Sequence, residues 1–216
     1  MTANTPQVFG LHYSVYTRIV LLALAEKGVT YDFQTVEIFG DSGVPIDHLE
    51  RHPFGRIPVF QHDGFELYET AAITRYIDEG FKGPALQPSS ARARARMSQV
   101  INVLDAYAYR PMVWDLYVEL VSNPQDGIAS DEQRVQAALP IVQRCLVQLS
   151  EWLAGDDYFV TQRLTLADLH AIPILHYLAK TTEGAGLLQH HPNLVKWMRR
   201  LASTTAITAM ARRSDP

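Results

Sequence analysis

The segment from Pro53 to Thr70, PFGRIPVFQHDGFELYET, constrains the fold more than any other part of the chain. It contains the X-Pro bond Ile57–Pro58 and then two short β runs joined by Asp63–Gly64. An Asp-Gly pair between such runs predicts a two-residue β-hairpin, because both turn positions require a positive φ. Glu69–Thr70 then places an acid and a hydroxyl at the start of a predicted helix. The segment therefore predicts a strand start, a hairpin and a helix in close succession.

The elements around this segment predict an α/β domain with one small sheet. Residues 8–11 form a β run, residues 16–27 are good helix formers followed by Gly28 at the C′ position, and residues 29–38 form a second strand. Short helices are expected at 46–51 and 70–79. A strand, helix and strand at this spacing make a parallel βαβ unit. With the hairpin, the sheet has four strands.

The second half of the chain lacks strand patterns and predicts an all-α domain. Glycines and prolines within residues 80–88 mark a linker. Helices are expected at 90–121, 131–154, 165–180 and 192–202, with a short one at 204–212. Pro111 should disturb the first of these helices. We therefore divide the chain into an N-terminal domain of residues 1–83, a linker of residues 84–89 and an all-helical domain of residues 90–216.

The motif LTLADL in the helical half predicts a capping box. Thr165 is the candidate N-cap and Asp168 its partner three residues later. We expect Asp168 to stabilise the helix start and to take no part in chemistry.

Composition narrows the class of protein. The 216 residues are 47% hydrophobic with a net charge of −4, which favours neither nucleic acid nor an anionic membrane as a partner. The single cysteine, Cys145, allows no disulfide framework. The polar first residues do not resemble a signal peptide, and the apolar run from Ile19 to Ala25 is far too short to cross a bilayer. We expect a cytoplasmic protein.

Two histidines have the spacing of zinc ligands, but the sequence around them does not support a zinc site. His48 and His52 have the i, i+4 spacing of zinc ligands, but no acid follows His48 directly and no third ligand is evident. We predict a pair on the protein surface and no metal site.

Three motifs give the chain a resemblance to a known family. VFGLHYSVYTR, HPFGRIP and DGFELYETAAITRYI resemble the cytosolic glutathione S-transferases, nearest to the phi class. The resemblance covers nearly the whole chain. It implies a thioredoxin-like N-terminal domain that binds glutathione and a helical domain that contributes a hydrophobic substrate site. It also implies a homodimer with a role in detoxification.

The resemblance assigns the glutathione-binding residues to the opening segment. Glu69 would pair with the ammonium group of the γ-glutamyl head, while Thr70 and the helix start would hold its carboxylate. Pro58 would be cis, so that the N–H and C=O of Ile57 pair with the cysteinyl backbone as an added strand. The alternative is that Thr70 is only an N-cap and Pro58 an ordinary trans proline.

Ser14 is the predicted catalytic residue. A hydroxyl donor at a helix N-terminus stabilises a thiolate and lowers the pKa of the thiol. The phi-like motif places its activating serine at Ser14, which would donate a hydrogen bond to sulfur. Simple helix capping is the alternative role. Tyr13, Tyr16 and Thr17 are rival hydroxyl groups.

Two departures from the phi pattern affect the glycyl end of glutathione. The phi class has a His-Lys pair where this chain has Gly43 and Val44, and a glutamine where it has Arg56. We therefore expect Arg56 to bind the glycyl carboxylate.

The second substrate is expected to contact an apolar helix face and the first loop. The expected residues are Tyr109, Met112, Val113 and Tyr117 with His12, Tyr13 and Phe39. Core packing is the alternative role for the helical residues.

The primary hypothesis is an enzyme that adds glutathione to small hydrophobic electrophiles, with peroxide reduction as a related activity. The alternative is a non-catalytic binding or interaction module on the same scaffold.

Overall fold

The structure, a computed structural model, describes residues 5–40 and 43–202. They form two compact units divided between Leu86 and Gln87, a point that lies inside the predicted linker. The helix expected at 204–212 lies outside the described residues. Within the described ranges, no helix has the length and hydropathy needed to cross a membrane.

The first unit has the predicted order of elements. They are β1 (Gln7–Gly10), α1 (Val15–Glu26), β2 (Asp32–Thr35), α2 (Ile46–Arg51), β3 (Val59–His62), β4 (Phe65–Leu67) and α3 (Thr70–Gly80). The sheet order is β2-β1-β3-β4, with β1 parallel to β2 and antiparallel to β3. β2 is shorter than predicted because its ladder with β1 runs only from Asp32 to Thr35, opposite the four residues of β1.

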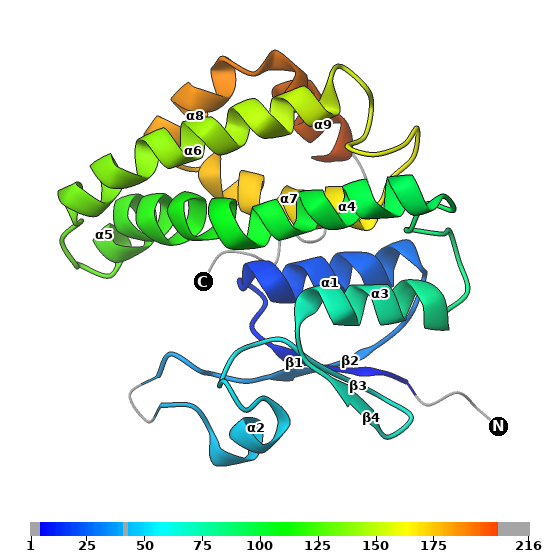
Figure 1. Ribbon diagram of the computed structural model, residues 1–216. Coiled ribbons are helices and arrows are strands. Elements are labelled where there is room, and N and C mark those ends of the chain that lie inside the picture. Colours follow the sequence, from blue (N-terminus) through cyan, green and yellow to red (C-terminus); the bar gives the residue numbers. More distant parts are fainter. Residues whose placement is uncertain (1–4, 41–42, 203–216) are drawn as a thin grey trace. The chain divides into compact units, whose positions relative to one another are not determined.

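Strand alternation gives the sheet two different faces. The row Val8, Phe33, Phe60 and Leu67 crosses all four strands on one face. Helices α1 and α3 cover that face, and α2 lies on the other side of the sheet (Figure 1). There the Arg51 guanidinium lies 4.5 Å from the ring centroid of Phe9 and 2.7 Å from a carboxylate oxygen of Glu66. Arg51 thus fixes α2 to the sheet.

The local turn predictions are confirmed. Gly28 has a φ of 66° just after α1. Asp63 and Gly64 have φ values of 50° and 77°, as the hairpin turn requires. The Ile57–Pro58 bond is cis.

The described part of the second unit is built from helical segments. They are α4 (Ala91–Val103), the π-helical segments η1 (Leu104–Ala108) and η2 (Arg110–Ser122), α5 (Asn123–Gln125), α6 (Glu132–Leu153), α7 (Leu166–Leu178), α8 (Thr182–Gln189) and α9 (Pro192–Ala202). Nearly every residue of α7 is buried, and η2 packs against α6 and α7. The disturbance expected at Pro111 takes the form of π-helical turns, in which Pro111 has no N–H to donate.

Helix α8 was not expected from the sequence, because Gly184 and Gly186 have low helix propensity. Packing explains why glycine is required at Gly184. A Cβ there would lie 2.2 Å from the carbonyl oxygen of Leu178. The Thr181 hydroxyl oxygen accepts a 2.9 Å hydrogen bond from the Gly184 N–H and so caps the helix.

The predicted capping box at Asp168 is confirmed and extended. Its Oδ2 accepts hydrogen bonds from the Thr165 N–H at 2.9 Å and the Thr165 hydroxyl at 2.8 Å. Its Oδ1 accepts from the Phe159 N–H and from Trp197 Nε1, each at 3.1 Å. The carboxylate therefore joins the start of α7 to the preceding loop and to α9.

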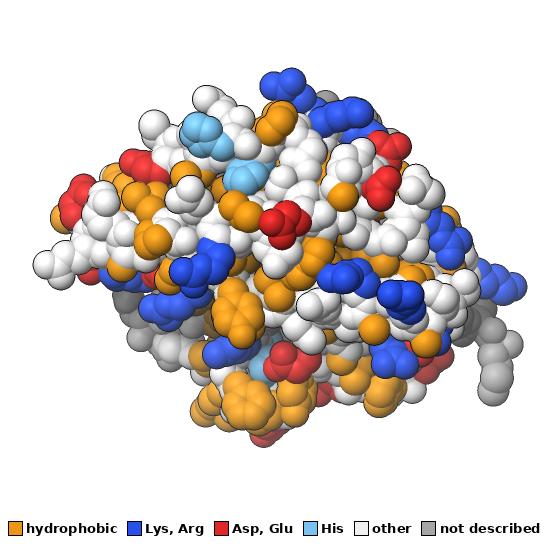
Figure 2. All heavy atoms as spheres, turned by 45° about the horizontal axis from the view of Figure 1, so that its top comes forward, with side chains coloured by type: hydrophobic (Ala, Val, Ile, Leu, Met, Phe, Trp, Pro, Cys, Tyr) orange, Lys and Arg blue, Asp and Glu red, His pale blue; other side chains and the backbone are white. Residues whose placement is uncertain are grey.

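The surface agrees with the modest net charge. On the face shown in Figure 2, basic and acidic side chains are interspersed. The arginines at the start of α4 are exposed, and Cys145 is buried.

Candidate functional site

The strand register brings three loops to one end of the sheet. β1 and β3 are antiparallel with Phe9 opposite Val59, and β4 returns antiparallel to β3. Ser14 follows the end of β1, Ile57 precedes β3 and Glu69 follows β4. The predicted catalytic and glutathione-contacting residues of the first unit therefore belong to loops at a single end of the sheet.

Ser14 is the N-cap of α1. Its Oγ accepts a hydrogen bond from the Thr17 N–H at 3.4 Å, and its own N–H donates to the Leu11 carbonyl at 3.0 Å. A hydroxyl has two lone pairs and one hydrogen, so capping leaves the hydrogen available. No acceptor for that hydrogen is found in the described part of the chain. Capping the helix and donating to a ligand are therefore compatible roles for Ser14.

The loop that carries Ser14 is braced from two elements. Arg18 of α1 is 1% exposed, and its Nε donates to the His12 carbonyl at 2.9 Å. The His12 ring stacks on Phe33 of β2, with centroids 3.9 Å apart and an interplanar angle of 17°. Arg18 thus supports the fold of this loop. Tyr13 is the more exposed of the two predicted substrate-contacting residues in it.

The rival hydroxyl groups differ in their surroundings. Thr17 is fully buried, and a Cβ added to Gly10 would lie 2.5 Å from its Oγ1, so Thr17 faces β1. Partial burial, with a smaller contribution from Glu37, raises the pKa of the Tyr13 phenol and makes it a weaker proton donor. Tyr16 is half-buried. Ser14 combines hydroxyl access with the helix start.

Ile57 carries backbone groups that lack partners. The residue is 8% exposed and precedes the cis bond to Pro58. Neither its N–H nor its C=O has a hydrogen-bond partner among the residues that the structure describes. Unpaired backbone groups on a buried residue are rare in folded proteins. This pattern favours an external partner, such as one more extended strand.

Glu69 has a backbone conformation that the sequence did not reveal. It is the N-cap of α3 with φ 70° and ψ 110°, while Thr70 is the first helical residue rather than the cap. Such angles strain a non-glycine residue, and strained residues cluster at ligand-binding sites. The Glu69 side chain is exposed and makes no capping bond. Its carboxylate therefore stays available to a cationic group.

Arg56 is the exposed cation of this loop. Unlike Arg51, which pairs with Glu66, its guanidinium has no ion-pair partner within the described ranges. The loop after β2 approaches the same region, because a Cβ on Gly55 would lie 3.2 Å from Val44 Cγ2. Val44 thus brings an apolar side chain against this loop.

The predicted substrate-contacting residues of the second unit differ in exposure. Tyr109 and Tyr117 are half-buried, whereas Met112 is fully buried and Val113 is 6% exposed. The burial of Met112 and Val113 favours the alternative role in the core, and the two tyrosines retain surface for a ligand. In the first unit, Phe39 is 57% exposed.

The prediction that His48 and His52 form a surface pair is wrong. They are 1% and 2% exposed. The reason is tertiary: His48 Nε2 hydrogen-bonds the Arg56 carbonyl at 2.8 Å, so the end of α2 lies beneath the following loop. In the described part of the chain, no group of three or more His, Cys, Asp or Glu side chains could hold a metal ion.

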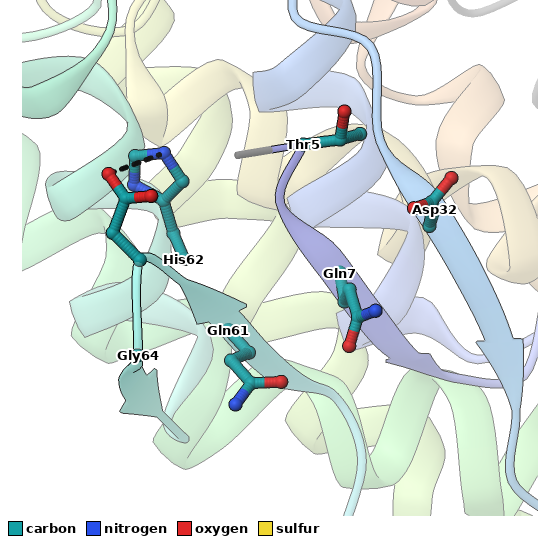
Figure 3. A pocket seen from close by; sticks show the side chains of 7 residues that line it. Thr5, Gln7, Asp32, Gln61, His62 and Gly64 are labelled. Carbon is teal, nitrogen blue, oxygen red and sulfur yellow. Dashed lines mark ion pairs between the residues drawn. The ribbon is translucent and has the colours of Figure 1, made fainter. Parts of the chain in front are cut away.

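A polar recess of about 420 Å³ lies elsewhere on the first unit. Figure 3 shows Gln7, Gln61 and Asp32 on neighbouring strands. His62 Nε2 lies 3.6 Å from Asp63 Oδ2 in the same recess. Because Gln7 begins β1 and His62 ends β3, this recess lies at the opposite end of the sheet from Ser14. It is separate from the candidate site, and we assign it no ligand.

Comparisons with known proteins agree with this geometry. Residues 5–79 match the family model "Glutathione S-transferase, N-terminal domain", and residues 100–204 match "Glutathione S-transferase, C-terminal domain". Glutathione S-transferase F6 of Arabidopsis thaliana is 31% identical over 199 residues, covering 91% of this chain and 94% of that protein.

Solved structures give the same result. Glutathione S-transferase III in its apo form is 27% identical with a TM-score of 0.85, covering 97% of this chain and 96% of that one. Glutathione transferase F7 from Populus trichocarpa is 25% identical with a TM-score of 0.86, covering 98% and 100%. The letter F denotes the phi class, so the predicted resemblance is confirmed. The chain belongs to the glutathione S-transferase family.

Proposed function

We propose that the first unit binds glutathione where the loops of Ser14, Ile57 and Glu69 meet, and that Ser14 activates its thiol for attack on small hydrophobic electrophiles. The backbone N–H and C=O of Ile57, which have no hydrogen-bond partner within the described ranges, are the observation that carries this proposal. They offer one donor and one acceptor to an extended peptide. Family membership supports the transferase activity.

The parts of glutathione match the chemistry of the loops. Its γ-glutamyl ammonium pairs with the exposed Glu69 carboxylate. Its γ-glutamyl carboxylate lies at the start of α3, where Thr70 and the first-turn N–H groups are donors. The cysteinyl backbone pairs with Ile57 next to Pro58, and the glycyl carboxylate pairs with the Arg56 guanidinium. Each partner is thus opposite in charge or complementary in hydrogen bonding.

Ser14 acts on the sulfur by donation. A free cysteine thiol has a pKa of about 8.5 and is mostly protonated at neutral pH. The Ser14 O–H donates to sulfur while its oxygen caps α1, and the helix N-terminus adds further stabilisation of the anion. The thiol proton passes to solvent, and the thiolate forms a carbon–sulfur bond with the electrophile, which either expels an anionic leaving group or, in an addition, takes up a proton from solvent. Reduction of a peroxide would begin from the same thiolate.

Binding and activation can be tested in sequence. The protein should be retained on immobilised glutathione, and a pH titration of ultraviolet thiolate absorbance should show a lowered pKa for bound glutathione. Ser14→Ala should return that pKa toward its free value. Absence of binding at millimolar glutathione would instead favour a non-catalytic interaction module.

The cellular setting follows from the same proposal. We place the protein in the cytoplasm, in agreement with its single buried cysteine, and assign it to detoxification.

We also propose a homodimer. Phe54 is 71% exposed beside Tyr68, with ring centroids 6.3 Å apart, and offers an aromatic contact to a second copy. Light scattering of the wild type and of Phe54→Ser would test the dimer, and cell fractionation would test the location.

A further inference from the structure

The end of α2 supports the proposed glutathione-binding loop through two buried histidines. His52 accepts a hydrogen bond from the Phe54 N–H at Nδ1 (3.4 Å), and its carbonyl accepts from the Gly55 N–H at 2.8 Å. Its ring packs on Tyr68, with centroids 4.7 Å apart. These contacts shape the turn that leads to Arg56.

His48 acts directly on the next peptide group. Its Nε2 lies 2.8 Å from the Arg56 carbonyl oxygen. A carbonyl only accepts, so Nε2 carries the hydrogen and the neutral ring is the Nε2–H tautomer. Its Nδ1 is buried and has no hydrogen-bond partner among the described residues. The ring therefore makes one hydrogen bond, and that bond goes to the loop.

The Arg56 carbonyl and the Ile57 N–H belong to one planar peptide unit. This unit is trans, so the two groups point in opposite directions; the cis bond is the next one, Ile57–Pro58. A hydrogen bond that fixes the carbonyl toward His48 thus fixes the Ile57 N–H away from His48. That N–H is the unpaired donor of the candidate site.

We propose that His48 is a positioning residue for glutathione binding: its Nε2–H holds the Arg56–Ile57 peptide unit so that the Ile57 N–H faces the cysteinyl backbone and Arg56 extends toward the glycyl end. The assignment of the ligand rests on the proposed function. The restraint on the loop is a property of the free protein and can be measured separately.

Two substitutions isolate the Nε2–H bond. His48→Phe keeps a ring of similar size and removes the donor together with the unpartnered Nδ1. His48→Gln is the matched control, because a glutamine amide nitrogen can take the place of Nε2. The melting temperature of each variant establishes that both are folded.

Limited proteolysis measures the restraint without any ligand. Trypsin cleaves after arginine, so the rate of cleavage at Arg56–Ile57 reports how often this segment opens. In His48→Phe we expect that rate to rise roughly three- to tenfold, the factor equivalent to one net hydrogen bond. His48→Gln should cleave at the wild-type rate. Equal rates in the wild type and His48→Phe, or equal increases in both variants, would overturn the inference.

Steady-state kinetics then measures the consequence for glutathione. His48→Phe should raise the KM for glutathione roughly three- to tenfold while kcat at saturating glutathione stays unchanged, and His48→Gln should restore the KM. A KM within twofold of the wild type in His48→Phe would refute the positioning role. If the wild type did not bind glutathione, the proposed function would fail and the proteolysis alone would decide whether His48 holds the loop.

Discussion

Comparing alanine with aspartate at position 14 should separate the two roles of Ser14. Ser14→Ala removes the acceptor that caps α1 and the donor proposed to face sulfur. The capping bond to the Thr17 N–H is long, at 3.4 Å. We therefore expect a loss of unfolding free energy at the lower end of the range for N-caps, about 0.5–1 kcal/mol.

The expected effect on the thiol is larger. A hydrogen bond to a charged group contributes about 1.5–3 kcal/mol, and one pKa unit corresponds to about 1.4 kcal/mol. Losing the Ser14 donor should raise the pKa of bound glutathione by about one to two units. Below that pKa the thiolate fraction falls about 10- to 100-fold, and the conjugation rate should fall with it.

Ser14→Asp provides a control with the opposite balance. Aspartate can accept from the Thr17 N–H and places a negative charge at the start of α1, so it should retain the cap. An ionised carboxylate cannot donate to sulfur and repels a thiolate. The order of stability should therefore be wild type close to Ser14→Asp and above Ser14→Ala. The order of thiol pKa should be Ser14→Asp highest and wild type lowest.

The assays are a pH titration of thiolate absorbance at saturating glutathione and a denaturant titration of each variant. The reasoning is refuted if both substitutions leave the thiol pKa unchanged while stability falls only in Ser14→Ala. Ser14 would then be a helix cap alone. The half-buried Tyr16 would become the next hydroxyl to substitute.

Three further predictions concern other residues. Arg56→Ala should raise the KM for glutathione roughly three- to tenfold, with Arg56→Gln intermediate, and an unchanged KM would remove Arg56 from the glycyl end. Complete burial lowers the pKa of His170 to about 3, so its contribution to stability is present above about pH 6.5 and is lost as the pH falls toward 3. In denaturant titrations at several pH values, His170→Leu should reduce the loss of unfolding free energy between about pH 6.5 and 3. An unchanged pH dependence would contradict this prediction. Thr165→Ala should lower the unfolding free energy by about 1 kcal/mol, and calorimetry showing no loss would mean that Asp168 holds the start of α7 without its partner.

Turn chemistry could be read from the sequence because single residues decide it. Gly28 and Asp63–Gly64 have the backbone geometry that their residue type and context predicted, whereas the cis bond at Pro58 was expected only from the family resemblance. The fold of the first unit follows from these turns and from the order of the strands. The positive φ of Glu69 could not be predicted in this way, because nothing in a glutamate favours it.

Tertiary contacts account for the remaining differences between the sequence-based predictions and the structure. His48 and His52 have the spacing of two residues on one helix face, but only the loop folded over α2 determines that this face is buried. Helix α8 has poor propensity and is set by the close approach of Gly184 to Leu178. In both cases the deciding group lies on another segment, where a pattern of neighbouring residues gives no information.

The unexpected features of the first unit nevertheless gather at one place. Among the described residues, the backbone N–H and C=O of Ile57 have no partner and the buried His48 ring makes one hydrogen bond, while Glu69 is strained. Local rules fail most often where a protein binds something, because a ligand supplies what the chain alone lacks. Arg56 connects these features, since its side chain replaces the expected glutamine and its carbonyl is held by His48. A search for the origin of glutathione affinity in this protein should therefore treat Arg56 and His48 as a coupled pair, and a double-mutant cycle on the KM for glutathione should give a coupling energy of at least about 0.5 kcal/mol.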